Sequence, residues 1–241
     1  WGYDGIEIAC WGDHMVPEKG ATDMGYIEEK RAILEKYDLQ CHALGAHLAG
    51  QCVGDDWDER LDAFAPDQIK GKPEEIRAWA TQEMIHTAKA AKNMGCYVVT
   101  GFLGSPIWKY LYSFPPTSDE MIEAGYQKIV DLWSPIFDEF DAAGIKFALE
   151  VHPTEIAYDY YTTCKLFEVF NRRPTLGLNF DPSHLVWQGI ESHVFISDFP
   201  DRIYHVHMKD AWWGHGDGTV GVFGGHTEFC DPGRFWDFRS V

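Results

Sequence analysis

The chain has 241 residues, of which 45% are hydrophobic and 24% charged, so it is long and apolar enough to bury a full core as one large domain. This composition excludes disordered, collagen-like and coiled-coil chains. Lys and Arg number 20 against 38 Asp and Glu, and the net charge of −18 would repel a phosphate backbone, so nucleic acid is not an expected partner. No run of eighteen apolar residues occurs, so we expect no membrane-spanning segment.

The six cysteines are scattered without C-x-x-C pairs, and several lie in apolar runs where a free thiol packs as a small hydrophobe. This pattern favours a reduced, cytoplasmic protein. We expect a single domain over residues 1–241. The oligomeric state stays open, with a homo-oligomer among the alternatives.

Apolar runs of strand length alternate along the chain with longer stretches of helical spacing. Strands are predicted over residues 5–11, 39–47, 96–102, 145–151, 176–180 and 203–208. Helices are predicted over residues 27–37, 74–94, 160–172 and, more weakly, 190–198. A further long helix is predicted to open at Thr117, which forms a capping-box pattern with Glu120, and to stop at Gly144.

Six βα units with continuous apolar strands indicate an α/β protein with a parallel sheet covered on both faces. No G-x-G-x-x-G or Walker pattern opens a helix, so a closed (β/α)8 barrel is favoured over a nucleotide-binding doubly wound sheet. We expect the first and eighth βα units to be missing or truncated, because the tail at residues 234–239 shows no final strand. An open sheet of six units is the alternative.

Three of the predicted strands end in polar side chains, namely Glu150, Asp181 and His207. They follow one another at intervals of 31 and 26 residues, each about one βα unit, so neighbouring strand ends can aim all three at one point. Two carboxylates and an imidazole suit a divalent ion, which would also relieve the repulsion between the carboxylates. The alternative is two helix caps and a hydrogen-bonded core histidine.

Several motifs around these residues resemble a known superfamily. They are GYDGIE at residues 2–7, LEVHPTE at 149–155, NFDPSHL at 179–185 and HVHMKD at 205–210. In this order they resemble the xylose isomerase-like TIM-barrel superfamily, within its sugar phosphate isomerase/epimerase branch. The resemblance covers nearly the whole chain.

The resemblance implies a metal held by Glu, Asp, His and a second Glu, and the first three map onto Glu150, Asp181 and His207. The fourth ligand would come from an eighth strand that this sequence does not include. One divalent ion is therefore expected, with Mn²⁺ preferred and Mg²⁺, Co²⁺ or Zn²⁺ as alternatives.

The superfamily also implies a metal-dependent isomerase or epimerase that moves a proton between adjacent carbons of a sugar through an enediolate. Glu150 is the candidate base, and His184 resembles the residue that contacts a substrate oxygen. The other candidate substrate-binding residues are His152, Glu155, His47, Glu7, Trp11 and Trp108. For each of these a salt bridge, a loop cap or core packing is the alternative.

The substrate is expected to be a small sugar, with an unphosphorylated one slightly preferred. A phosphorylated substrate would need Arg or Lys beside the site. The candidates Arg172, Arg173 and Arg202 lie near ends of predicted helices, on the far side from the predicted site. The long glycine-rich stretch 212–233 is unlike a simple βα turn and is a candidate lid.

Three other functions are compatible with parts of the pattern. The first is a metallo-endonuclease of the same superfamily, which the chain resembles at His47, Glu150, Asp181, His184 and His207. Against this function, residues 101–104 lack the histidine that such an enzyme would need, and the net charge of −18 opposes DNA binding. A dehydratase or lyase acting on an inositol-derived ketone is a second alternative. A non-catalytic sugar- or metal-binding relative is the third.

Overall fold

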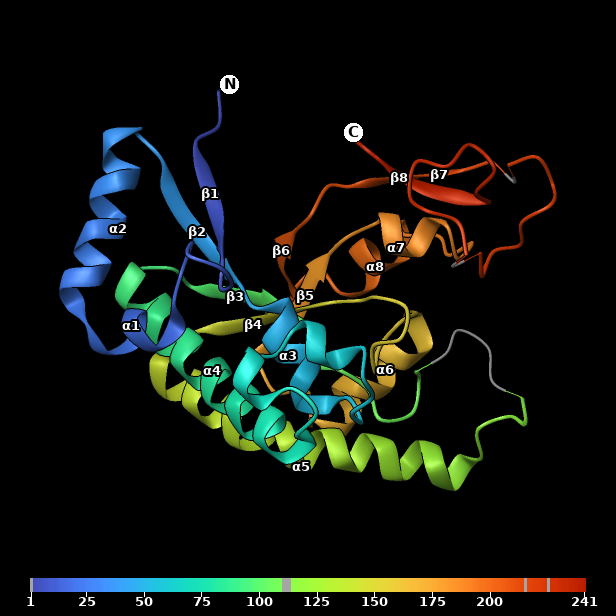
Figure 1. Ribbon diagram of the computed structural model, residues 1–241, viewed down its shortest axis with the longest axis horizontal. Coiled ribbons are helices and arrows are strands. Elements are labelled where there is room, and N and C mark those ends of the chain that lie inside the picture. The colour runs from blue at the N-terminus through green and yellow to red at the C-terminus, as the bar shows by residue number, and fades with distance from the viewer. Residues whose placement is uncertain (1, 110–113, 215, 225) are drawn as a thin grey trace.

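The computed structural model describes residues 2–109, 114–214, 216–224 and 226–241, and its centre is a parallel sheet of six strands. The strands are β1 (Gly5–Ala9), β2 (Gln40–Gly45), β3 (Val98–Gly101), β4 (Lys146–Glu150), β5 (Leu176–Phe180) and β6 (Ile203–Val206). They lie side by side in sequence order, β1 to β6, with parallel pairing throughout. In a doubly wound sheet the strand order reverses at a switch point, whereas here the strands follow the sequence order. This order and the curl of the sheet in Figure 1 confirm a partial (β/α)8 barrel.

Helices connect the strands and cover the outer face of the sheet (Figure 1). The α-helices are α1 (Pro17–Thr22), α2 (Met24–Lys36), α3 (His47–Gly54), α4 (Pro73–Met94), α5 (Asp119–Ala143), α6 (Tyr160–Val169), α7 (Ser183–Val186) and α8 (His193–Asp198). Two short 3₁₀ turns, Leu61–Ala63 and Asp67–Ile69, precede α4. The helices predicted from spacing are confirmed, with ends shifted by a few residues.

The longest helix, α5, shows how local sequence sets its ends. Its N-cap is Ser118, whose side chain accepts a hydrogen bond from the backbone N–H of Met121, so the prediction of Thr117 as the first capping residue was off by one position. Its C-cap is Gly144 with φ +75°, as predicted, because this left-handed conformation costs glycine little.

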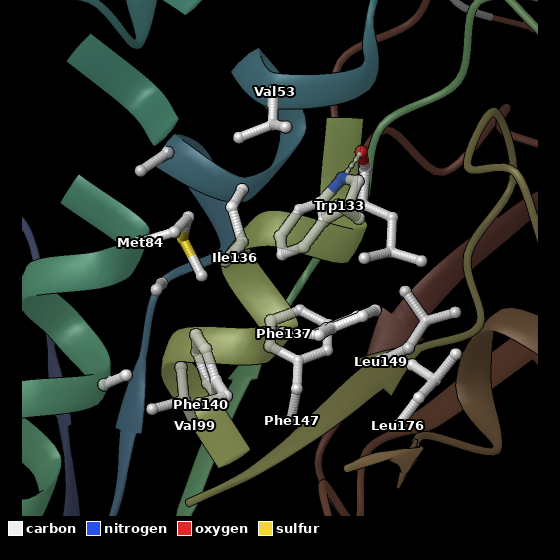
Figure 2. Packing of buried hydrophobic residues seen from close by; sticks show 14 of the residues in the cluster. Val53, Met84, Val99, Trp133, Ile136, Phe137, Phe140, Phe147, Leu149 and Leu176 are labelled. Atoms are coloured by element: carbon white, nitrogen blue, oxygen red, sulfur yellow. Dashed lines mark hydrogen bonds between the residues drawn. The ribbon is translucent and has the colours of Figure 1, made fainter. Parts of the chain in front are cut away.

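The core lies between α4, α5 and the outer face of the sheet (Figure 2). Its largest members come from one face of α5, where Trp133, Phe137 and Phe140 are fully buried. These rings contact Phe147 of β4 at centroid separations of 5.1 to 5.7 Å. The indole N–H of Trp133 also donates to the carbonyl oxygen of Leu103 at 2.9 Å, which ties the helix to the loop after β3.

A hairpin follows the parallel sheet and was not predicted. Strands β7 (Asp210–Trp213) and β8 (Trp236–Arg239) pair antiparallel with each other and form a separate sheet. Among the described residues the parallel sheet ends at β6, so the tail adds no final strand to the barrel, as expected. Phe238 of β8 lies against His184, with ring centroids 5.2 Å apart, and Trp236 stacks on Trp187 at 4.3 Å. The hairpin thereby closes one side of the strand ends. Within the described part of the chain, none of the helices combines the length and the apolar character of a membrane span.

Candidate active site

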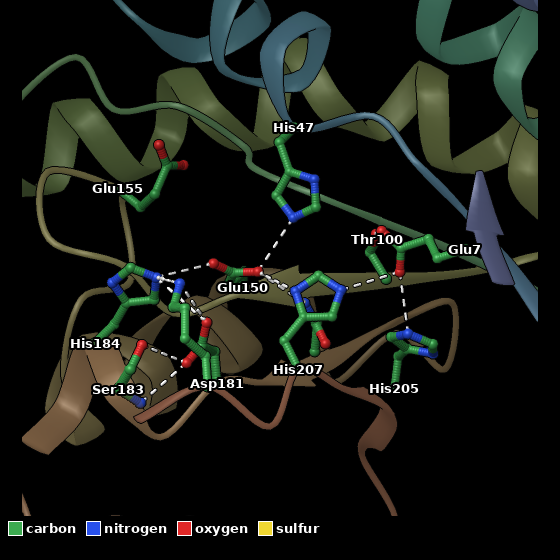
Figure 3. A network of polar contacts seen from close by, with 12 residues as sticks. Glu7, His47, Thr100, Glu150, Glu155, Asp181, Ser183, His184, His205 and His207 are labelled. Atoms are coloured by element: carbon green, nitrogen blue, oxygen red, sulfur yellow. Dashed lines mark hydrogen bonds and ion pairs between the residues drawn. The ribbon is translucent and has the colours of Figure 1, made fainter. Parts of the chain in front are cut away.

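A polar cluster fills the inside of the curled sheet at the C-terminal ends of its strands (Figure 3). Its members are Glu7 from β1, His47 at the start of α3, Thr100 from β3, Glu150 at the end of β4, Asn179 from β5, Asp181 and His184 after β5, His205 from β6, and His207 and Lys209 after β6. Parallel strands bring these ends to one face, as the sequence predicts.

Glu150 lies at the centre of the cluster and is only 4% exposed. Its Oε1 lies 3.1 Å from Nε2 of His184. Its Oε2 accepts a hydrogen bond from the amide of Asn179 at 2.8 Å and lies 2.9 Å from Nδ1 of His207 and 3.2 Å from Nε2 of His47. Burial raises the pKa of Glu150, but the hydrogen bonds with His184, His207 and His47 outweigh it and hold that pKa far below its usual range. Glu150 is therefore ionised at neutral pH.

Asp181 is the second buried carboxylate, at 3% exposure. Its Oδ1 accepts hydrogen bonds from the backbone N–H of Ser183 at 2.9 Å and from the Ser183 hydroxyl at 2.6 Å. Its Oδ2 accepts no hydrogen bond, although the Lys209 ammonium forms an ion pair with it at 2.8 Å and Nε2 of His184 lies 3.4 Å away. One carboxylate oxygen is thus fixed by the backbone, and the other is directed at cationic partners.

The His207 ring lies between two carboxylates, with Nδ1 toward Glu150 at 2.9 Å and Nε2 toward Glu7 at 3.0 Å. Burial lowers the pKa of His207, but the hydrogen bonds with Glu150 and Glu7 raise it further, to about 10. Without a metal ion the ring therefore carries a positive charge at neutral pH. A divalent ion at Nδ1 would take the place of that charge.

The three predicted ligands divide into two overlapping groups that share Glu150. Asp181 lies with Glu150 and His184, and His207 lies with Glu150 and His47, the candidate ligand atoms within each group being no more than 4.8 Å apart. The donor set fits a divalent ion on two observations. Oδ2 of Asp181 is buried and has an ion pair with Lys209 but no hydrogen bond, and Oε2 of Glu150 faces three nitrogens at once.

The remaining predicted residues are distributed between this cluster and its surroundings. The His152 ring contacts His184 at a centroid separation of 4.1 Å, and burial lowers the pKa of His152 to about 3, so this imidazole is neutral. Trp11 lies at the edge, its ring centroid 6.5 Å from that of His47. Trp108 contacts Tyr158 instead and lines a separate cavity beside α5 and α6.

Glu155 is buried next to the cluster but is directed at the main chain. Its Oε2 accepts hydrogen bonds from the backbone N–H groups of Leu103 at 3.0 Å and Gly104 at 2.7 Å, and its Oε1 is buried without a partner. Burial, and then the nearby charge of Asp55, raise the pKa of Glu155 well above its usual value. In this structure Glu155 fixes the loop after β3.

Sequence analysis did not predict that three further residues lie in or beside this cluster. Asn179 stands inside a strand otherwise read as apolar, and its position two residues before Asp181 was the available signal. Lys209 lies in the HVHMKD motif but was not among the candidate site residues, and it pairs with Asp181. Phe238 has its ring 4.4 Å from the Lys209 ammonium, a contact that depends on the unpredicted hairpin.

Comparison with known proteins identifies the family of this fold. A family model described as xylose isomerase-like TIM barrel matches residues 1–241. The uncharacterized protein YfiH of Bacillus subtilis (strain 168) is 29% identical over 140 residues, which cover 56% of this chain and 44% of YfiH. The chain therefore spans less than half the length of this relative.

Solved structures share the fold at low identity. The 3-keto-D-glucoside 4-epimerase YcjR of E. coli matches with a TM-score of 0.61 and 17% identity, covering 86% of this chain and 68% of YcjR. The probable 3-DHS dehydratase AsbF of Bacillus anthracis matches with a TM-score of 0.59 and 18% identity, covering 86% of this chain and 63% of AsbF. Another structure of this fold contains a bound zinc atom.

Proposed function

The chain belongs to the xylose isomerase-like TIM-barrel family, and from that premise we propose that it is a metal-dependent sugar isomerase or epimerase that moves a proton between adjacent carbons through an enediolate. The observation that carries the proposal is Glu150, an ionised carboxylate at a strand end, within a cluster of side chains that could hold a metal ion. The substrate class we propose is a small sugar, with an unphosphorylated one preferred.

Glu150, Asp181 and His207 would hold one divalent ion, with Mn²⁺ as the first candidate. In the structure the candidate ligand atoms form two groups that share Glu150, one with Asp181 and His184 and one with His47 and His207. Bound there, the ion supplies Lewis-acid stabilisation of the negative charge that develops on the substrate oxygen.

The side chains of the protein supply the proton transfer and the positioning. Glu150 is the proposed acceptor of the proton from the substrate carbon, a role that needs the ionised carboxylate that its lowered pKa provides at neutral pH. His184 is placed to donate a hydrogen bond to a substrate hydroxyl, since its Nε2 already faces the Glu150 and Asp181 oxygens. The Lys209 ammonium adds a positive charge beside Oδ2 of Asp181, and the Phe238 ring of the hairpin lies against this ammonium.

The proposal is tested by incubating the protein with Mn²⁺ and a panel of ketoses, aldoses and inositol-derived ketones in deuterated water. We expect solvent deuterium to enter the carbon next to the carbonyl of one substrate, with formation of an isomer or epimer detected by NMR. Glu150→Gln is expected to lower this rate at least about a hundredfold with an unchanged circular dichroism spectrum. Glu139→Gln, which removes only an exposed ion pair with Lys89, is the matched control and keeps the rate.

The same experiment separates the alternative activities. A dehydratase, the class of the fold neighbour AsbF, would release water from the substrate, because an enediolate can also expel a β-hydroxyl group. A non-catalytic relative would bind Mn²⁺ and a sugar without deuterium exchange. A near-normal rate in Glu150→Gln would remove Glu150 from the role of base.

A further inference from the structure

The carboxylate of Glu7 reaches across the inside of the sheet from its first strand to the side chain that follows its last strand (Figure 3). We propose that Glu7 is a positioning residue, which holds the His207 ring so that Nε2 keeps its hydrogen and Nδ1 is the atom offered to the metal ion. This inference rests on the metal centre of the proposed function and assigns Glu7 a role other than substrate contact.

Only one nitrogen of His207 is placed to be a ligand of that centre. Nδ1 lies 2.9 Å from Oε2 of Glu150, on the side of the candidate ligands, and Nε2 lies 3.0 Å from Oε2 of Glu7. A carboxylate can only accept a hydrogen bond, and a neutral imidazole has one N–H and one lone pair. Without an ion both nitrogens face a carboxylate and the ring is protonated. Where a metal ion takes the place of the proton on Nδ1, the contact with Glu7 keeps the hydrogen on Nε2 and leaves the lone pair of Nδ1 for the ion.

Glu7 is itself held in place by three other strands. The hydroxyl of Thr100 on β3 donates to its Oε1 at 2.9 Å, and Nε2 of His205 on β6 lies 3.0 Å from its Oε2. Gly45 on β2 leaves the space that the carboxylate fills, because a Cβ at this position would lie 2.6 Å from Oε1. A carboxylate confined in this way restrains the ring that it contacts.

These contacts also argue against the expectation that Glu7 binds substrate. Both of its oxygens already have partners, Oε1 in Thr100 and Oε2 in the imidazoles of His205 and His207. One other role fits the same atoms, since Glu7, His205 and His207 lie close enough to hold a second metal ion. The two roles differ in a testable way, because a second ion would need His205 as a ligand, and positioning does not.

The first experiment measures the affinity of the protein for Zn²⁺ by competition with a chromophoric chelator. Glu7→Gln removes the charged acceptor with little change of shape, and we expect it to weaken Zn²⁺ binding by about 10–100-fold. Gly45→Ala displaces the carboxylate without changing its charge and is expected to weaken binding in the same direction. The surface control Glu139→Gln is expected to keep the wild-type affinity. His205→Gln removes one of the contacts that hold Glu7, so it is expected to weaken Zn²⁺ binding less than Glu7→Gln does, and to keep one ion per chain. Loss of an ion in His205→Gln would establish a second metal site and overturn the positioning role.

The second experiment needs no substitution of Glu7, so it stands even if those variants do not fold. Histidine side chains are labelled with ¹⁵N, and the His207 signals are assigned by their absence in His207→Gln. In the Zn²⁺-bound protein we expect Nε2 to carry hydrogen and Nδ1 to show the shift of a metal-bound nitrogen. Hydrogen on Nδ1 would overturn the inference.

Failure of the inference and failure of the metal centre give different results. If the wild-type protein does not bind Zn²⁺, the metal centre and the role of Glu7 are both refuted. If the wild-type protein binds Zn²⁺ and Glu7→Gln binds it equally well, only the role of Glu7 is refuted.

Discussion

Asp55 follows α3 and is a carboxylate that the fold partly buries to hold the loop after β3. Its Oδ1 accepts a hydrogen bond from the backbone N–H of Ser105 at 2.6 Å, and its Oδ2 accepts one from the amide of Gln51 at 3.2 Å. Burial raises the pKa of Asp55 from 3.8 to about 6, against the lowering effect of these hydrogen bonds. Since the pKa is higher in the folded protein than in the unfolded chain, the contribution of Asp55 to stability is fully present below about pH 4 and is lost as the pH rises through 6.

The size of this effect follows from the shift. At about 1.36 kcal/mol for each pKa unit, ionisation of Asp55 lowers the free energy of unfolding by about 2 kcal/mol between pH 4.5 and pH 7. Asp55→Asn keeps an acceptor for Ser105 but cannot ionise. We therefore expect the stability of the variant relative to wild type to rise by about 2 kcal/mol over this pH range, measured by urea unfolding at several pH values. Glu155, whose pKa is also raised by burial and by Asp55, acts in the same direction.

Asp62→Asn provides the control, because Asp62 is an exposed carboxylate whose pKa is lowered by hydrogen bonds from the Gly71 backbone and the Trp57 indole. The contribution of Asp62 to stability changes only below about pH 4. The difference in free energy of unfolding between Asp62→Asn and wild type is therefore expected to stay constant between pH 4.5 and pH 7. A flat difference for Asp55→Asn as well would refute the reasoning that burial of Asp55 destabilises the folded protein at neutral pH.

Two further predictions concern packing. Trp133→Ala should lower the free energy of unfolding by about 3–5 kcal/mol, because it empties a fully buried site and leaves the Leu103 carbonyl without its donor. Trp133→Phe should lower it clearly less. Equal losses of the two variants in urea unfolding would contradict the packing argument. Trp236→Ala removes the stack on Trp187 and the hydrogen bond to the Val222 carbonyl. It should therefore speed proteolytic cleavage between β7 and β8 while leaving the melting temperature of the main sheet nearly unchanged. Equal cleavage rates in the variant and the wild type would show that this stack does not hold the hairpin.

The repeating part of the structure was predictable because each βα unit carries its own local signals. Apolar runs gave the six parallel strands, and helical spacing gave the helices between them. The positions of Glu150, Asp181 and His207 followed from the same logic, since a polar residue directly after a buried parallel strand lies at the common face. These predictions needed no knowledge of contacts between distant residues.

The remaining features depend on such contacts. The hairpin of β7 and β8 joins residues separated by a long loop with little periodicity. Its rings Phe238 and Trp236 pack against His184 and Trp187, which are distant in the sequence. The direction in which a carboxylate points also cannot be predicted from the sequence. Glu155 lies in the same motif as Glu150, but its carboxylate accepts hydrogen bonds from the main chain of residues 103 and 104. Glu7 was read as a substrate contact because its strand position was predicted and its two histidine partners were not.

The contact between Glu7 and His207 joins residues 200 positions apart, and this separation determines when the site can form during folding. Closing a chain segment of that length costs about 5 kcal/mol of entropy, which local helix and strand formation does not recover. The contact therefore belongs to the end of folding, after the intervening strands have paired. On the ribosome, a growing chain would have to release β6 before His207 can meet Glu7, so binding of the proposed ion would follow completion of the sheet.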